Sequence, residues 1–438
     1  MLERGQIPGI EPTIRVGIIL PEDRQTNVSL DLSNIPDYQI IPKHLQTESQ
    51  PYHIEVEQDS LRINGNRLDK LHLRRLDKGI DLGKIIEVYP VVAGRGFHWE
   101  KKIRLNLLGD LEIMVHQGAL LAINILPLEQ YLMCVATSEM NAACPPALIH
   151  AQTIVARSWV LANVEQKHRQ LGFDVCNDDC CQRYQGTNYL TRQAQVGALA
   201  TRGEVLLYEG SICDARYSKS CGGMTESFET IWDGNTIPYL QVRRDFEDNG
   251  LEDLPLSSET NAARWITSTP PAFCSPATVP GDSLAQYLGS VDEAGRYYRW
   301  KVNYTQSQMT ELLNLKLGLQ AVNVIEIIPV SRGGSGRLNR IRIRYTDRNR
   351  EIRLREVISE YEIRRVFHTR FLYSSAFIVD RLAVEDKIPG EFTLRGAGWG
   401  HGVGLCQIGA LGMALKGYAV PAILTHYYPG SELTKIYP

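Results

Sequence analysis

The sequence lacks any apolar stretch of the kind that crosses a membrane as a helix, which takes about 18 or more consecutive apolar residues. It also shows no apolar run of signal-peptide length near its beginning, because Arg15 and Gly17 interrupt the segment 14–20. We therefore expect no transmembrane segment and no visible secretory signal. Two interpretations stay open, a cytoplasmic protein or a chain whose export segment is not part of this sequence.

An excess of basic charge is also missing. The 438 residues carry 47 Lys and Arg against 50 Asp and Glu, which gives a formal net charge of -3. Proteins that bind nucleic acid over a broad surface present a strong positive field, so nucleic acid is not an expected partner. The 43% hydrophobic content is that of an ordinary globular protein, and any ligand must be inferred from local sites.

The cysteines follow neither a paired pattern nor the C-x2-C spacing of a zinc ribbon. There are nine, so at least one is unpaired within the chain, and a framework made only of disulfides is not expected. His168, Cys176 and Cys181, with Cys180 beside them, still gather an imidazole and thiols in one loop, a combination that suits zinc. A disulfide, a reactive thiol or small buried cysteines stay as alternatives. Adjacent cysteines rarely ligate one metal together, so we expect Cys180 or Cys181 to be spare.

Two common catalytic signatures are absent as well. The segment GAGWGHGVG, 396–404, has alternate glycines, but none of them starts the G-x-G-x-x-G of a dinucleotide-binding loop. G-x-S-x-G does not occur around Ser218 or Ser220, which weakens a serine hydrolase interpretation. Tyr217, Ser218 and Ser220 precede Gly222, where hydroxyls and closely approaching backbone suit a neutral polar ligand. A serine-rich hairpin turn is the structural alternative.

What is present predicts an α+β fold with two or three structural units. Short β-type runs separated by turns define a β-rich N-terminal region, 1–128. A mixed core follows at 129–245 and returns at 386–438, and residues 246–385 form an inserted second α+β lobe. Apolar residues spaced three and four apart predict one long helix at about 146–168. Further predictions are a hairpin of 324–330 with 338–346, a helix at about 355–366, and a helix that begins near Gln407 and ends at Gly417.

Three polar residues stand out in this core. Glu139 has apolar neighbours in ATSEMNAACPP, and a carboxyl group in apolar surroundings stays protonated more readily, as a general acid must. A solvated glutamate in a helix-entry loop is the alternative. Arg157 lies in the long helix, where a surface arginine with a snorkelling side chain is commoner than a substrate clamp. If 396–404 is extended, its glycines share one face and His401, with Trp399, lies on the other.

Five motifs follow one another in a fixed order: SEM at 138–140, PPALIHAQTIVARSWVLAN at 145–163, GFDVCNDDCCQRYQG at 172–186, YSKSCGGMTES at 217–227 with IWDGNTIPYL, and the glycine-rich segment 396–430. Together they resemble the SpoIID/LytB family of peptidoglycan-active proteins. The resemblance covers about 130–245 and 365–432. It implies a lytic transglycosylase that cuts between N-acetylmuramic acid and N-acetylglucosamine in denuded glycan strands and leaves 1,6-anhydro ends.

The resemblance also implies roles for individual residues. Glu139 would be the general acid and base, and it would lie in a glycan groove with one wall formed by the glycine segment. The lining would include Arg157, Tyr217, Ser220, His401 and Gln407. A structural zinc would be held by His168, Cys176 and Cys181, with Cys180 where the family often has a histidine. The family acts in the cell envelope, and a non-catalytic enhancer of a cell-wall amidase, as in LytB-type relatives, is the alternative function.

Overall fold

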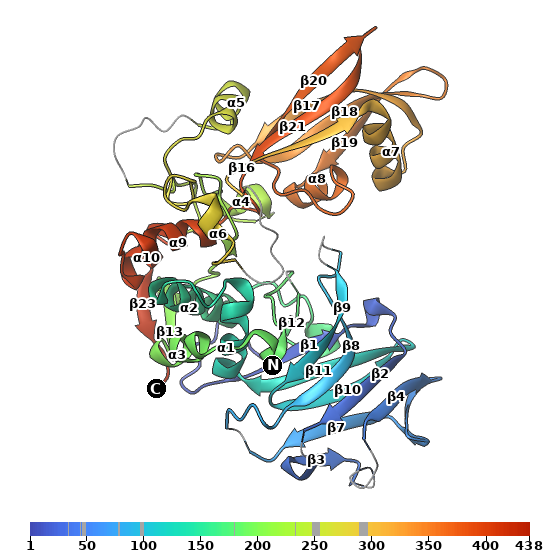
Figure 1. Ribbon diagram of the computed structural model, residues 1–438, viewed down its shortest axis with the longest axis vertical. Helices are drawn as coiled ribbons and strands as arrows, with labels where there is room; N and C mark the ends of the chain where they lie inside the picture. The colour runs from blue at the N-terminus through green and yellow to red at the C-terminus, as the bar shows by residue number, and fades with distance from the viewer. Residues whose placement is uncertain are drawn as a thin grey trace. The chain divides into compact units, whose positions relative to one another are not determined.

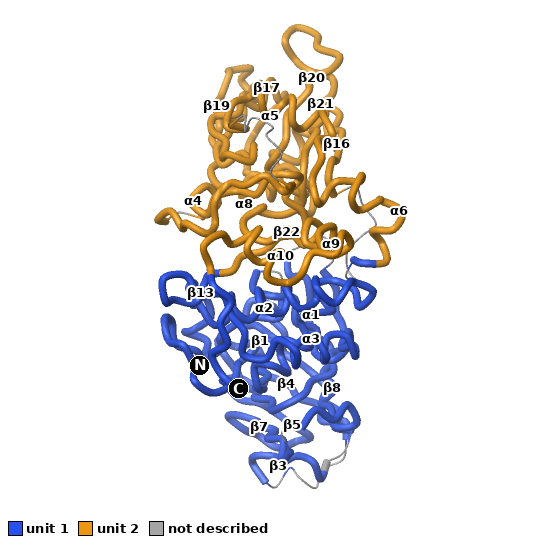
Figure 2. The backbone as a smooth tube through the Cα atoms, turned by 90° about the vertical axis from the view of Figure 1, so that its left-hand side faces the viewer, with its two compact units in different colours: residues 1–214, 287–292, 432–438 blue, residues 215–286, 293–431 orange. Residues whose placement is uncertain are grey.

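The computed structural model describes residues 1–33, 35–43, 45, 50–77, 79–96, 100–178, 180–232, 234–247, 255–288 and 297–438. Helices and several separate sheets confirm the predicted α+β class. The chain forms two compact units, distinguished by colour in Figure 2. Unit 1 comprises 1–214, 287–292 and 432–438, and unit 2 comprises 215–286 and 293–431. No helix in the described ranges has the length and apolar character that a bilayer span requires.

Two six-stranded sheets make up the β-rich part of unit 1 (Figure 1). The order in the first is β12 (Val175–Cys176), β1 (Thr13–Ile19), β11 (Ala119–Pro127), β10 (Asp110–His116), β7 (Lys70–Arg75), β3 (Tyr38–Ile41). The order in the second is β6 (Asn66–Leu68), β5 (Ser60–Ile63), β4 (Tyr52–Glu57), β2 (Asn27–Leu32), β8 (Ile86–Ala93), β9 (Lys101–Leu107). Alternate residues such as Val28 and Leu30 of β2 are buried, and both sheets contribute to one apolar cluster.

Three helices of unit 1 pack on one another next to β1 and β11, as Figure 1 shows: α1 (Leu128–Glu139), α2 (Pro146–Ala162) and α3 (Arg192–Ala200). The predicted long helix was too long at its C-terminal end, because Asn163 adopts a left-handed conformation with φ 45° and caps α2. A small sheet joins β14 (Ser211–Ile212), β13 (Glu204–Tyr208) and β23 (Glu432–Lys435). Residues from the predicted N-terminal region and the predicted core share a sheet, because Val16 pairs with Val175.

The described residues of unit 2 form three sheets. One joins β16 (Arg299–Thr305), β21 (Ile388–Ala397) and β20 (Phe377–Glu385), and another joins β17 (Ala321–Arg332), β18 (Leu338–Asp347) and β19 (Ile352–Ile358). The third is the pair of β15 (Tyr217–Ser218) with β22 (Leu405–Cys406). Its helices are α4 (Phe228–Ile231), α5 (Glu259–Thr267), α6 (Gly281–Leu284), α7 (Gln306–Leu317), α8 (Glu360–Val366), α9 (Gln407–Leu415) and α10 (Val420–Tyr427). The β17–β18 hairpin and the helix that begins at Gln407 are confirmed.

Candidate functional site

Glu139 is the last residue of α1 rather than part of a helix-entry loop. Its side chain is 7% exposed, so the alternative of a solvated glutamate is wrong. The backbone N–H of Arg183 donates a hydrogen bond of 3.2 Å to Oε1. The chain turns directly after it, where Met140 pairs with Leu288 and the amide of Asn141 bonds the carbonyl of Tyr287. The carboxyl group therefore occupies a fixed and nearly enclosed position at a helix end.

The loop 176–185 supplies the contacts that hold this helix end. Arg183 also accepts a hydrogen bond through its carbonyl from the hydroxyl of Ser138, next to Glu139. Gln182 is fully buried, where Tyr131 Oη donates to its Oε1 at 2.9 Å and its Nε2 donates to the carbonyl of Ala156 at 3.1 Å. One amide side chain therefore ties the loop to both α1 and α2. The position of Glu139 depends on the course of this loop.

The same loop brings together His168, Cys176, Cys180 and Cys181, whose ligand atoms all lie within 4.8 Å of one another. Sγ of Cys176 is 2.9 Å from Sγ of Cys180, and Sγ of Cys181 is 3.5 Å from Nε2 of His168. Three thiols and an imidazole at this separation fit a tetrahedral zinc ion. The expectation that one adjacent cysteine stands apart is not met by the geometry, since Cys180 and Cys181 both reach the cluster. Hydrogen bonds from Cys176 and Cys181 hold the pKa of the Cys180 thiol far below its ordinary value.

Arg157 is fully buried, so the expectation of a surface arginine is wrong. Its Nε and Nη2 donate to the two carboxylate oxygens of Glu129, at 2.9 and 2.6 Å. Nη1 donates to the carbonyl of Glu204 at 3.0 Å, and Thr201 lies within 3.5 Å. Tyr437 Oη donates to the same glutamate at 2.7 Å. The guanidinium thus links α1, α2 and the small sheet, and in this structure it is enclosed by protein.

The other residues expected at the site lie in unit 2, where two distant segments run together. Tyr217 pairs with Leu405 and Ser218 with Cys406, in parallel register. Ser220 and Trp399 exchange backbone hydrogen bonds of 3.0 and 2.8 Å. Gln407 begins α9 and is 1% exposed. Tyr217, Ser218, Ser220, His401 and Gln407 therefore form one neighbourhood, and the groove that would join them to Glu139 stays a prediction.

The glycine segment is not extended beyond Ala397, which corrects the prediction of two alternating faces. Gly398, Gly400, Gly402 and Gly404 have φ values of 76°, 95°, 79° and 72°. L-residues with side chains rarely adopt this conformation, so each alternate position requires glycine for its backbone alone. After β21 the segment is irregular, with bends at Gly400 and Gly404 and single β-bridges at Trp399 and Val403.

Close packing is a second reason why these positions must be glycine. A Cβ on Gly402 would come within 2.3 Å of Cζ of Arg337, and one on Gly404 within 2.0 Å of the carbonyl oxygen of Arg216. A Cβ on Gly222, opposite the segment, would lie 2.7 Å from the amide nitrogen of Gly398. Arg337 is fully buried, and its Nε donates to the carbonyl of Gly400 at 3.1 Å. The guanidinium group of Arg337 therefore packs directly against the backbone of these glycines, in the space that a side chain would need.

Arg337 is linked through a serine to a buried carboxylate. Its Nη1 donates to Oγ of Ser335 at 2.9 Å, and that hydroxyl donates to Oε2 of Glu226 at 2.7 Å. Glu226 is fully buried, and the pairing of Glu226 with Val403 places it beside the glycine segment. This chain of hydrogen bonds compensates two buried charges, which would otherwise be costly to remove from water.

His401 is half-buried against Trp232, with ring centroids 4.9 Å apart. Its Nδ1 accepts a hydrogen bond of 3.0 Å from the amide of Val403. Burial, followed by the nearby guanidinium groups of Arg216 and Arg337, lowers the pKa of this imidazole well below 6.5. A neutral imidazole that accepts at Nδ1 carries its proton on Nε2. His401 is therefore a neutral donor at physiological pH.

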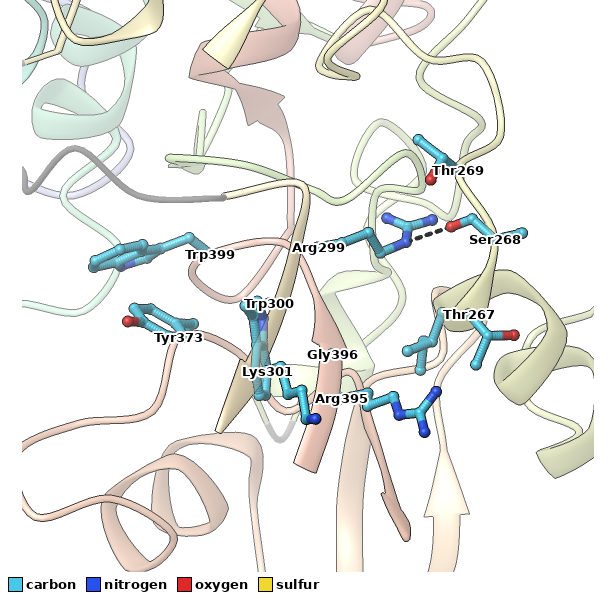
Figure 3. A pocket seen from close by; sticks show the side chains of 11 residues that line it. Thr267, Ser268, Thr269, Arg299, Trp300, Lys301, Tyr373, Arg395, Gly396 and Trp399 are labelled. Carbon is cyan, nitrogen blue, oxygen red and sulfur yellow. Dashed lines mark hydrogen bonds between the residues drawn. The ribbon is translucent and has the colours of Figure 1, made fainter. Parts of the chain in front are cut away.

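A pocket of about 470 Å³ opens beside this segment in unit 2 (Figure 3). Trp399 and Tyr373 lie side by side at one end, with ring centroids 4.7 Å apart, and Trp300 is next to them. Lys301 and Arg395 supply cationic groups at the rim. Aromatic faces with a few hydrogen-bond donors are a composition that suits a polar ligand with apolar faces.

Comparisons with known proteins show which family this chain resembles. Residues 116–208 match the model described as "Stage II sporulation protein" (SpoIID), and residues 226–404 match a domain of unknown function, DUF8618. The chain is 24% identical over 325 residues to stage II sporulation protein D of Bacillus amyloliquefaciens, covering 71% of this chain and 75% of that one. These matches support an assignment of the chain to the SpoIID/LytB family.

Two further proteins are similar to this chain. An amidase enhancer of Bacillus subtilis is 24% identical over 308 residues, which are 68% of this chain and 40% of the enhancer. An uncharacterized protein of Brachyspira hyodysenteriae is 24% identical over 353 residues, 80% of this chain and 79% of that protein. The chain thus spans less than half of the enhancer and most of the other two.

The sequence did not predict the residues that hold the site residues in place through buried hydrogen bonds. Glu129, Gln182, Glu226 and Arg337 each make buried contacts with residues that are distant in the chain. Only Gln182 had a local signal, because it directly follows the cysteine cluster.

Proposed function

We propose that the protein is a lytic transglycosylase that cleaves the bond between N-acetylmuramic acid and N-acetylglucosamine in peptidoglycan glycan strands. The supporting observation is Glu139, a nearly enclosed carboxyl group held at the end of α1 by the amide of Arg183. Such a fixed carboxyl group is what a single acid and base catalyst requires. The relatives named stage II sporulation protein D are consistent with this substrate class and with a location in the cell envelope.

In the proposed reaction, the protonated carboxyl group of Glu139 gives its proton to the glycosidic oxygen as the bond from that oxygen to C1 of the muramic acid breaks. The resulting carboxylate then takes the proton of the 6-hydroxyl of the same sugar, and the oxygen attacks C1. The product has a 1,6-anhydro ring, no water is consumed, and Glu139 ends protonated as it began. One carboxyl group serves both steps, so no second carboxylate nucleophile is needed.

The remaining expected residues have supporting roles in this proposal. Tyr217 and His401, which are partly exposed, contact the glycan, and the buried Ser218, Ser220, Gly222 and Gln407 lie behind that surface. Arg157 acts through Glu129 rather than on the sugar, because its guanidinium is enclosed. A zinc ion held by His168, Cys176, Cys180 and Cys181 would fix the loop that carries Arg183. That ion would be structural, and the proton transfers remain with Glu139.

The test is product analysis on glycan strands stripped of stem peptides. The purified protein is expected to generate 1,6-anhydro-muramyl ends that mass spectrometry detects. Glu139→Gln should abolish them, whereas Glu209→Gln, at an exposed glutamate of the same unit, should not. Absence of anhydro ends with the wild type, or their formation at the same rate by Glu139→Gln, would refute the proposal. Loss in Ser220→Ala but not in Glu139→Gln would indicate a serine hydrolase instead.

A non-catalytic glycan-binding protein that enhances a cell-wall amidase is the second candidate. The relative named amidase enhancer and the aromatic pocket at Trp399 favour it. The two candidates differ in one measurement. An enhancer would bind denuded strands without producing anhydro ends, and would raise the rate of an added cell-wall amidase equally well with Glu139→Gln.

A further inference from the structure

A second group of metal-ligand side chains lies in unit 2, away from the loop of His168. Cys221, Asp245, Cys274 and Cys406 are all buried, and their ligand atoms lie within 4.8 Å of one another. The four residues come from separate segments. Cys221 follows β15, Asp245 and Cys274 flank α5, and Cys406 ends β22 at the start of α9. The fold therefore brings together three thiols and a carboxyl group, of which the first and last in the chain, Cys221 and Cys406, are 185 residues apart.

The spacing matches a tetrahedral ion. Sγ of Cys221 is 3.7 Å from Sγ of Cys274. Two sulfurs bound to one zinc at about 2.3 Å each, with tetrahedral angles, are separated by about 3.8 Å. A disulfide would need a separation near 2.0 Å. A disulfide would also join only two of the three thiols and would leave the third thiol and Asp245 unexplained, whereas one metal ion would use all four groups.

The negative charge of the buried Asp245 favours a bound cation beside it. Asp245 is completely buried, and Tyr427 Oη donates to its Oδ1 at 2.7 Å. Among the ion pairs of the described residues, the basic group facing Asp245 is the imidazole of His426, at 3.7 Å. A buried carboxylate beside thiols is costly to hold in the protein interior without a bound cation.

Two backbone amides converge on the sulfur of Cys406. The backbone amides of Cys221 and Gly409 donate to its sulfur at 3.2 and 3.3 Å. Amide donors of this kind stabilise and orient thiolate ligands of metal ions.

Gly409 makes room for the carboxylate. A Cβ at this position in α9 would lie 2.6 Å from Oδ2 of Asp245 and 2.3 Å from Oη of Tyr427. The helix therefore has a glycine where the fourth ligand and its hydrogen-bond donor meet. The amide of Cys274 fixes the other side of the carboxylate, at 3.1 Å from Oδ2.

We propose that Cys221, Cys274, Cys406 and Asp245 form a closed, structural zinc site in unit 2, distinct from the cluster at His168. Three thiolates and one carboxylate complete a tetrahedral shell and leave no open position, so the ion holds segments together and performs no chemistry. Binding a divalent ion releases the protons of those thiols that are not yet ionised. Asp245 and Cys274 lie within the matched segment 226–404, and Cys221 and Cys406 lie just outside it. The ion thus fastens this segment to its flanks.

Metal analysis of the full-length protein tests the site. Purified wild-type protein should contain about two zinc ions per chain. A Cys274→Ser/Cys406→Ser variant should contain about one, and a Cys176→Ser/Cys181→Ser variant should keep the ion of unit 2. Cys134→Ala, at a buried cysteine outside both groups, is the control and should keep two.

The wild type alone can overturn the site if a variant fails to fold. No zinc in the wild type, or the same zinc content in Cys274→Ser/Cys406→Ser as in wild type, would do so. So would cross-linked peptides containing Cys221, Cys274 or Cys406 in a non-reducing peptide map. Because these readouts are metal content and thiol state, they are independent of glycan cleavage. Failure of the cleavage assay leaves this site standing, and the reverse is also true.

Discussion

Nη2 of Arg157 lies 2.6 Å from Oε2 of Glu129, and both side chains are almost completely enclosed. Glu129 receives further hydrogen bonds from the amide of Gly203 and the hydroxyl of Tyr437. The pair therefore connects α1, α2, the start of β13 and the last residues of the chain. A buried pair of this kind matters most when one partner is removed, because the other charge is then left unpaired.

Arg157→Ala should lower the free energy of unfolding of unit 1 by about 3–5 kcal/mol. Urea unfolding followed by circular dichroism measures this. Arg62→Ala is a matched control, since its pair with Glu57 is exposed at 3.6 Å, and should cost no more than about 1 kcal/mol. Equal effects of the two substitutions would contradict the structural role given to Arg157.

Removing the thiols of the His168 cluster should loosen the hydrogen bond to Glu139. In Cys176→Ser/Cys181→Ser, the amide of Arg183 should exchange with deuterium at least about tenfold faster than in wild type, because loop 176–185 loses its anchor. Hydrogen exchange read by mass spectrometry measures this, with Cys134→Ala as the control. Unchanged protection of Arg183 would show that Gln182 holds the loop without the cluster.

Gly402→Ala should destabilise unit 2 more than its backbone conformation alone explains. Gly402 and Gly417 have φ values of 79° and 87°, but only at Gly402 would a Cβ meet another group, Arg337. Gly417→Ala therefore measures the backbone strain, about 1–2 kcal/mol. The clash at Gly402 should add about 1–3 kcal/mol. Thermal unfolding of both variants gives the comparison, and equal losses would argue against tight packing around Arg337.

The low pKa of His401 should make unit 2 less stable in mild acid. Below pH 6.5 the imidazole takes up a proton in the unfolded chain but not in the folded one, so stability is full above that pH and falls below it. Relative to His401→Gln, wild type should lose about 2 kcal/mol between pH 8 and pH 5. His116→Gln, in β10 of unit 1, is the control. A parallel pH dependence of wild type and His401→Gln would refute the assignment.

Trp399→Ala should weaken binding of denuded glycan strands about tenfold, because a stacking surface of the pocket is lost. Isothermal calorimetry measures the affinity. Thr267→Ala is the control for a change at the pocket wall that leaves the Trp399–Tyr373 stack in place. If Trp399→Ala binds as wild type does, the pocket is not a glycan subsite.

Local patterns in the sequence predicted many of the elements. The alternating residues of β1, β17 and β18 and the glycine that follows α9 gave correct elements. Helix α1 was not recognised, because its twelve residues are all buried and show no polar face. A periodic pattern identifies a helix at the surface, and a fully enclosed helix has none.

Pairing between distant residues could not be predicted in the same way. Nothing near Arg157 indicates Glu129, 28 positions earlier, and nothing near Gly402 indicates Arg337. The alternation of glycines was visible in the sequence. Glycine at every second position, however, fits both an extended strand and a backbone with positive φ at alternate residues, as observed here. Only the packing of Arg337 and Arg216 against the bare backbone distinguishes them.

The bridge between Glu226 and Val403 has a topological consequence. The matched segment 226–404 begins at the first of these residues and ends next to the second, so its two ends lie beside each other within unit 2. Just outside the segment, β15 and β22 are paired, with Tyr217 opposite Leu405. The segment is therefore a closed excursion of the chain, whose two ends are held at a fixed separation by strands that lie outside it.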